Sequence, residues 1–138
     1  MRVADLHLAA RRCLDATKPA DKLRLTRETW AAVAAGGLLA DPAAPPAAPI
    51  GVPGRPDRPA LVDARALPRR GLGSAQGRAA LVHAIAHIEF NAINLAWDAV
   101  YRFRGMPGAY YRDWASCAND EARHYALLAA RLGELGYA

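Results

Sequence analysis

Apolar residues recur every three to four positions along the second half of the chain. From residue 79 to residue 101 there is no Gly or Pro, and steps of three or four from Glu89 reach only apolar side chains. These are Val82, Ile85, Ala86, Ala92, Ile93, Ala96 and Val100. Such spacing is typical of an amphipathic helix, which we predict from Gln76 to Arg104. Ser74 is suited to cap its N-terminus.

A second long helix is predicted from Tyr110 to Leu135, because Gly and Pro at residues 105–108 end the first pattern and Gly136 ends the next. Glu121 shares an apolar stripe of this helix with Trp114, Cys117, Ala118, His124, Tyr125 and Leu128. Two long helices joined by a short turn form an antiparallel hairpin. The aromatic residues that open the second helix, Tyr110, Tyr111 and Trp114, are expected to pack in the core and at its rim.

The front of the chain predicts two shorter helices. One covers Val3–Thr17, and the other runs from Pro19 to about Ala35, where Gly36 and Gly37 end it. On the second of these we expect Leu23, Trp30, Val33 and Ala34 to pack, and Thr26, Arg27 and Glu28 to form a polar outer face. The predicted fold class is all-α, with an N-terminal helical arm (1–39), a Pro/Arg-rich segment (40–75) and the helical hairpin (76–138).

Eight of the ten prolines fall between residues 40 and 75, which largely excludes helix and favours polyproline II with turns. Two interpretations remain open for this segment. It is either a solvated linker or an ordered strap along the hairpin. Apolar side chains that would anchor a strap are Ile50, Val52, Leu61, Val62 and Leu67.

Charge and composition restrict the class of protein. The net charge of +5 arises in residues 1–76, with 12 Lys and Arg against 7 Asp and Glu, whereas residues 77–138 carry 6 of each sign. Because an Arg-, Ala- and Pro-rich composition also follows from a GC-rich genome, we do not expect nucleic-acid binding. The two cysteines, Cys13 and Cys117, form no metal-binding or disulfide pattern. Without a signal peptide or membrane span in the sequence, we expect a cytoplasmic protein.

Glu89, Glu121 and His124 are the candidate metal ligands. In an antiparallel hairpin the two carboxylates lie within about 5 Å of each other in height, and His124 follows Glu121 by one turn. A Glu on one helix and Glu-x-x-His on its neighbour is half of the ligand set of a di-iron four-helix bundle. Alternatively, the carboxylates are neutral or paired with an Arg of the Pro-rich segment, and His124 is a core residue.

His83, His87 and Asp120 are further polar residues of the two long helices, and each has two interpretations. His83 and His87 lie one turn apart, on a stripe with Asn91, Asn94 and Asp98 that points away from Glu89. They form either a polar face that touches the Pro-rich segment or a second metal site. Asp120 is either a solvated acid or a partner for a ligating histidine.

The run RRGLGSAQGRAALVHAIAHIEFNAINLAWDAVYRF and the later run MPGAYYRDWASCANDEARHYALLAARLGELGY resemble a ferritin-like family known as domain of unknown function 455. The resemblance covers about residues 50–138 closely and the N-terminal helices loosely. It implies a ferritin-like bundle with a dinuclear iron or manganese site, whose ligands here would be Glu89, Glu121 and His124. The wider superfamily includes di-iron oxidases, hydroxylases and a tRNA hydroxylase.

Members of that family usually continue through two more long helices, which carry a second Glu and a second Glu-x-x-His. This chain ends at Ala138 and so resembles the N-terminal half of the domain. We therefore expect a homodimer that rebuilds a four-helix bundle and its site, with oxidoreductase or hydroxylase activity. The alternatives are a non-enzymatic scaffold or a truncated, inactive fragment. A weaker alternative is an RNA-associated protein, which would bind through Arg55, Arg58, Arg65, Arg69 and Arg70.

Overall fold

The computed structural model describes residues 5–56 and 73–136, and the regular secondary structure in these ranges is all helical. The helices are α1 (Leu6–Asp15), α2 (Pro19–Ala34), α3 (Ala75–Arg102) and α4 (Gly108–Glu134), and no strand occurs in these ranges. An isolated backbone bridge joins Asp5 to Leu39 beside the start of α1. The all-α prediction is confirmed, and each helix begins and ends within three residues or so of its predicted bounds.

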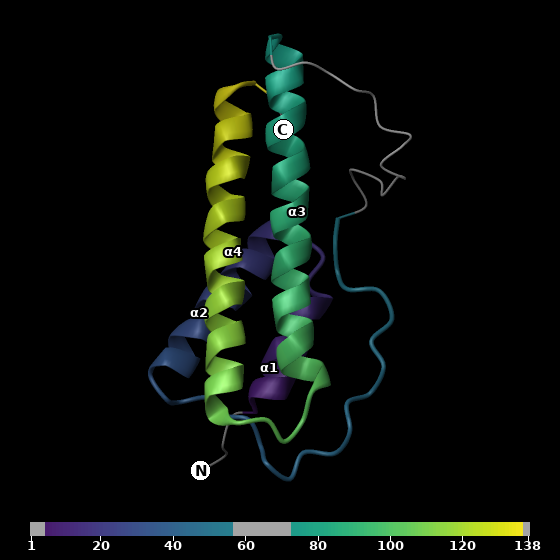
Figure 1. Cartoon of the computed structure of the whole chain (residues 1–138), viewed down its shortest axis with the longest axis vertical. Coiled ribbons are helices and arrows are strands. Elements are labelled where there is room, and N and C mark those ends of the chain that lie inside the picture. Colours follow the sequence, from purple (N-terminus) through teal and green to yellow (C-terminus); the bar gives the residue numbers. More distant parts are fainter. Residues whose placement is uncertain (1–4, 57–72, 137–138) are drawn as a thin grey trace.

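The long helices α3 and α4 form an antiparallel pair, which Figure 1 shows side by side in green and yellow. At the start of α3 the Ser74 hydroxyl accepts a hydrogen bond from the Gly77 N–H at 2.9 Å, as the sequence predicts. The turn between the helices is held by Tyr111, whose hydroxyl donates to the Phe103 carbonyl and accepts from the Met106 N–H. Gly105 adopts a φ of 70° in this turn, a conformation that favours glycine.

The short helices α1 and α2 cover one face of this hairpin, in the half that lies nearest the turn (Figure 1). Helix α1 packs on α3 and α2 packs on α4, so the core lies between the short and the long pairs. Its fully buried side chains include Leu6, Leu14, Ile93, Trp97 and Val100. The other face of α3 and α4 is covered by no other helix among the described residues.

The prediction for the outer face of α2 is wrong at Thr26, whereas Arg27 and Glu28 are exposed as expected; Ala34, which was expected to pack, is exposed. Thr26 is fully buried, and Lys22 and Thr29 lie on the same buried side of the helix. Their polar atoms have partners there, because Thr26 Oγ1 accepts from the Trp97 indole N–H at 3.0 Å and Lys22 Nζ donates to carbonyl oxygens at the end of α1. Buried polar groups are tolerated where such hydrogen bonds form.

Residues 40–56 of the Pro-rich segment run along α1 and α3 and bond to them. The Tyr101 hydroxyl donates to the Ala48 carbonyl at 2.8 Å, and the Gly54 N–H donates to the Leu14 carbonyl at 2.6 Å. Ile50 packs against the core, whereas Val52 is 77% exposed. The other expected anchors, Leu61, Val62 and Leu67, lie outside the described residues.

Helix α3 is long and apolar enough to cross a membrane by length and composition, with a mean hydropathy of 1.2 in its most apolar window. A single helix of this kind is weak evidence for a membrane span, because core helices of soluble proteins meet the same criterion. Trp97, Ile93 and Val100 of α3 are fully buried against other parts of the chain. Of the residues in that apolar window, 33% are buried inside the structure.

Candidate metal centre

The structure brings Glu89, Glu121 and His124 together between α3 and α4. One ligand atom from each residue lies within 4.8 Å of the others. His124 Nδ1 is 3.7 Å from Glu89 Oε2 and 3.7 Å from Glu121 Oε2. The antiparallel register sets this geometry, since it places Glu89 opposite Glu121 and the 3.6-residue period places His124 one turn later.

The cluster lies at the rim of the hairpin, so the alternative in which His124 is a core residue is wrong. The side chains of Glu89 and Glu121 are 20% and 23% exposed, and that of His124 is 48% exposed. Only part of the predicted stripe points into the core. Ala86, Ile93 and Val100 are buried, whereas Ile85 is 36% exposed. The reason is that α1 and α2 cover the opposite face.

One atom of the cluster is buried without a partner. Glu89 Oε2 is excluded from solvent and accepts no hydrogen bond, although the rest of the carboxylate reaches the surface. A buried carboxylate oxygen is costly unless a proton donor, a cation or a metal ion faces it. Two carboxylates and an imidazole are donors that suit iron, manganese or zinc as divalent ions. The residues therefore fit a metal ion by both position and chemistry.

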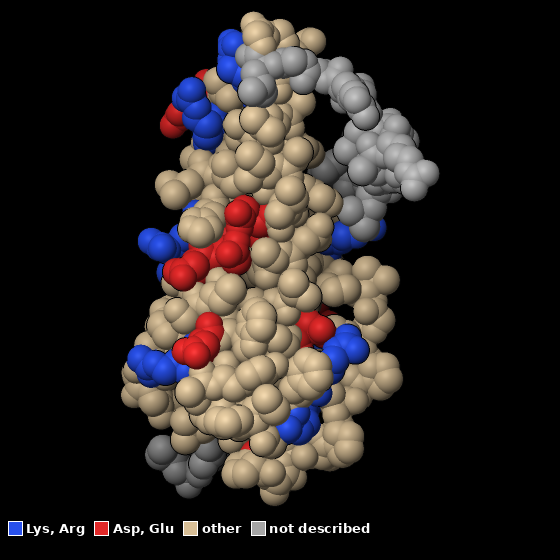
Figure 2. All heavy atoms as spheres, viewed as in Figure 1, with Lys and Arg blue, Asp and Glu red and all other residues tan. Residues whose placement is uncertain are grey.

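Large apolar side chains near the cluster are exposed. Figure 2 shows acidic side chains gathered at mid-height on the face of the hairpin turned toward the viewer, with basic side chains beside them at the left edge. Ile88, next to Glu89, is 62% exposed, and Leu127, three residues after His124, is 70% exposed. This face therefore combines a carboxylate cluster with large exposed apolar side chains.

The other polar candidates are separate from this cluster. His83 and His87 line a cavity with Arg55 and Pro56 of the Pro-rich segment, which matches the expected polar face toward that segment. Asp120 pairs at 3.3 Å with Arg123 on the surface, as a solvated acid would. Tyr111 is buried, and Tyr110 and Trp114 pack against the core, as predicted. Of the five arginines suggested for RNA, Arg58, Arg65, Arg69 and Arg70 lie outside the described residues.

Sequence reasoning missed two buried polar side chains. Lys22 is fully buried, and its Nζ donates to the carbonyls of Cys13 and Leu14 and to Asn94 Oδ1 at 2.7, 3.0 and 2.5 Å. Burial lowers the pKa of Lys22 to about 8. His7 is also buried, with Nδ1 2.9 Å from the Val100 carbonyl oxygen, and burial lowers its pKa. The sequence carries a signal for His7, which lies three residues before Ala10 and seven before Leu14 on the apolar side of α1. It carries none for Lys22, which shares its side of α2 with Thr26 and Thr29.

The chain was compared with known proteins. A protein of Haemophilus influenzae named only "Uncharacterized protein" is 43% identical over 89 residues, which covers 59% of this chain and 31% of the relative. The match thus spans about a third of that relative's length. No solved structure matches the chain. The profile of a protein family of unknown function, DUF455, matches residues 15–138, and the chain therefore belongs to the DUF455 family.

Proposed function

We propose that Glu89, Glu121 and His124 are half of a dinuclear metal site in a ferritin-like bundle. The observation that carries this proposal is the buried, unpartnered Glu89 Oε2, which lies 3.7 Å from His124 Nδ1 and close to the Glu121 carboxylate. Glu89 would bind the metal from α3, and Glu121 and His124 from α4. Iron or manganese is the expected metal, because carboxylates with one imidazole are suited to both.

With iron or manganese bound, such a site supplies redox chemistry to an oxidoreductase or hydroxylase. The protein's own contribution is to hold the ligands. The side chain of Glu121 is fixed by a helix that packs on α2, and Glu89 by a helix that packs on α1. Neighbouring apolar side chains such as Ile85 and Ile88 would exclude water once that face is covered.

The remaining ligands would come from a second copy of the hairpin. Three protein ligands are too few for a dinuclear site, and two hairpins related by a twofold axis supply six. The exposed side chains of Ile88 and Leu127 lie beside the cluster, where a partner hairpin would bury them. A homodimer would thus complete the four-helix bundle and the site together.

Metal analysis of the purified protein tests the ligand assignment. We expect iron or manganese in roughly stoichiometric amount in the wild type, and its loss in Glu121→Ala and in His124→Ala. Asp120→Asn is the matched control, because Asp120 is an exposed acid next to Glu121 that pairs only with Arg123 among the described residues. Chelation should lower the melting temperatures of the wild type and of Asp120→Asn, and should leave those of Glu121→Ala and His124→Ala unchanged. A wild type without metal, unable to take up either ion, would refute the assignment.

Sedimentation equilibrium tests the dimer separately. We expect a dimer at tens of micromolar, and a shift toward monomer when Ile88 or Leu127 is replaced by Lys. Val52→Lys is the control, because Val52 is exposed on the Pro-rich segment. A stable, soluble wild-type monomer at this concentration would rule out completion by a second copy, while metal analysis would still report on the ligands.

A second candidate function, a non-enzymatic scaffold, is supported by the exposure of the cluster. His124 Nδ1 lies 3.7 Å from a carboxylate oxygen of Glu89 and 3.7 Å from one of Glu121, so the three side chains can interact at the surface without a metal ion. In that case Glu121→Leu should leave the stability unchanged or raise it, since surface ion pairs contribute little. If the site binds metal, the same substitution should abolish the stabilisation that added metal gives.

A further inference from the structure

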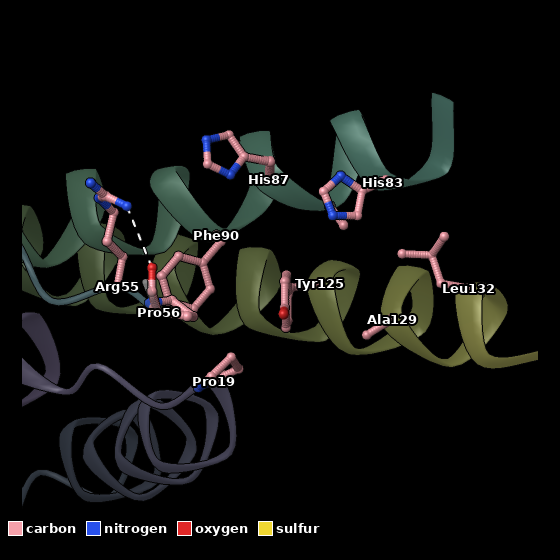
Figure 3. A pocket seen from close by; sticks show the side chains of 10 residues that line it. Pro19, Arg55, Pro56, His83, His87, Phe90, Tyr125, Ala129 and Leu132 are labelled. Carbon is pink, nitrogen blue, oxygen red and sulfur yellow. Dashed lines mark hydrogen bonds between the residues drawn. The ribbon is translucent and has the colours of Figure 1, made fainter. Parts of the chain in front are cut away.

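A cavity of about 250 Å³ lies on a different side of the hairpin from the carboxylate cluster. In Figure 3, His83 and His87 project from α3, with Tyr125, Ala129 and Leu132 on α4 across from them. Arg55 and Pro56 of the Pro-rich segment and Pro19 at the start of α2 complete its wall. Four parts of the chain thus converge on this cavity.

Most of the wall is apolar. Ala86, Phe90 and Leu132 are buried residues of the hairpin, and the two prolines add further apolar surface. Phe90 packs edge to face on Tyr125, with ring centroids 5.4 Å apart. Phe90 and Tyr125 line the cavity, whereas Glu89, Glu121 and His124 do not. The two sites are therefore distinct.

The charged and polar side chains of the described wall are an arginine, two histidines and a tyrosine, each of which can donate a hydrogen bond. Arg55 Nε is buried and has no hydrogen-bond partner. Nη1 of the same guanidinium donates a long hydrogen bond, 3.4 Å, to the Pro56 carbonyl oxygen. His83 and His87 add two imidazoles, and Tyr125 adds a phenol. Among the described residues that line the cavity there is no Asp or Glu. In the described part of the wall, Arg55 therefore has no acidic partner.

We propose that this cavity binds a small carboxylate with an apolar body. The guanidinium of Arg55, which lines the cavity, would hold the carboxylate, for which its planar N–H groups are suited. Phe90, Leu132 and the prolines would enclose the apolar body. The volume corresponds to about eight water molecules, or to a ligand of about ten non-hydrogen atoms.

The composition of the wall favours a carboxylate over a phosphate. A phosphate dianion needs several charged or backbone donors around three oxygens. In the described lining the Arg55 guanidinium is the one permanently charged group, and the two imidazoles and the phenol stand in a mainly apolar wall. A monoanion with an aryl or branched aliphatic group satisfies both parts of the cavity. This inference does not depend on the metal site, because no residue of the cluster lines the cavity.

The test uses phenylacetate, its neutral isostere phenylacetamide and inorganic phosphate as probes of the full chain. By NMR titration we expect phenylacetate to shift the resonances of Phe90, His87 and Leu132 with a Kd of about 0.1–1 mM. Phenylacetamide should bind at least about tenfold more weakly, because it lacks the charge that pairs with Arg55. Phosphate should cause no comparable shifts.

Three variants locate the site. Arg55→Met should weaken phenylacetate about tenfold and leave phenylacetamide unchanged. Ala129→Phe should fill the cavity and remove the binding of both probes, and its circular dichroism and melting temperature show whether it folds. Arg27→Met is the matched control, since Arg27 is an exposed arginine of α2 outside the cavity and its loss should change neither affinity.

Three results would overturn the proposal. One is equal affinity for phenylacetate and phenylacetamide, which would remove the role of Arg55. Another is phosphate binding tighter than that of phenylacetate, which would make the cavity an anion site of another class. The last is an absence of shifts at Phe90, His87 and Leu132 up to 10 mM phenylacetate, about tenfold above the weakest expected Kd.

Discussion

Lys22 joins three helices through hydrogen bonds to Cys13, Leu14 and Asn94, and we expect Lys22→Met to destabilise the fold strongly. Methionine keeps the length of the side chain but offers no donor. It therefore leaves two carbonyl oxygens at the end of α1 and one amide oxygen of α3 buried without this partner.

The size of the effect follows from two opposing contributions. Each bond from a charged donor is worth about 2 kcal/mol, so the three together contribute about 6 kcal/mol. Removing the ammonium returns the cost of its burial. That cost is about 3 kcal/mol, because burial lowers the pKa of Lys22 from 10.5 to about 8. The free energy of unfolding at pH 7 should thus fall by about 3 kcal/mol, and the melting temperature by about 10 °C.

Urea denaturation, followed by circular dichroism and by the fluorescence of the buried Trp97, measures this difference. The chain offers a matched control, since Lys18 is the only other lysine and is exposed. Lys18→Met should change the stability by less than about 0.5 kcal/mol. If the free energy of unfolding of Lys22→Met lies within about 1 kcal/mol of the wild-type value, the three bonds contribute little more than the cost of burying the ammonium.

Further predictions concern the same network and the ends of the hairpin. Between pH 8 and 10.5 the unfolded chain holds a proton that the folded chain has lost at Lys22, so the stability difference between the wild type and Lys22→Met should grow with pH. We expect a rise of about 1 kcal/mol from pH 8 to pH 9 in urea titrations, and a flat or falling difference would contradict the lowered pKa. Gly54→Ala should cost about 2 kcal/mol in thermal unfolding, because a Cβ there would lie 2.5 Å from the carbonyl oxygens of Asp15 and Ala16. Gly73→Ala, with open space around it, should be neutral, and equal effects of the two substitutions would argue against the close approach. Ser74→Ala should lower the free energy of unfolding by about 1 kcal/mol, because it removes the N-cap of α3. Ser116→Ala is the control and should not lower it, because Ser116 lies in the interior of α4 and caps no helix. Equal melting temperatures of these two variants would exclude a capping role.

The helices could be predicted from the sequence because their limits are local. Ser74, Gly105 and Gly136 mark the ends of α3 and α4 through capping and backbone conformation, which depend on neighbouring residues alone. The grouping of Glu89, Glu121 and His124 was also predictable, since helical period and antiparallel register fix it. Both inferences need only the chain's own periodicity.

The features that the sequence did not predict depend on contacts between helices. The burial of Lys22 and Thr26 follows from the carbonyls at the end of α1 and the Trp97 indole, and nothing near α2 in the sequence indicates either partner. The exposure of the carboxylate cluster likewise follows from which face α1 and α2 cover. An amphipathic stripe shows that a helix has a buried side, but its width does not show where that side stops.

Gly54 bonds the Pro-rich segment to both α1 and α3 at one residue. Its N–H binds Leu14, its carbonyl accepts from Asn94, and the next residue is Arg55. Release of the segment at Gly54 would therefore remove one wall of the cavity and one partner of the Asn94–Lys22 pair at the same time. By thermodynamic linkage, a ligand held by Arg55 and the buried ammonium of Lys22 each bias the same closed state, although they occupy different places in the molecule.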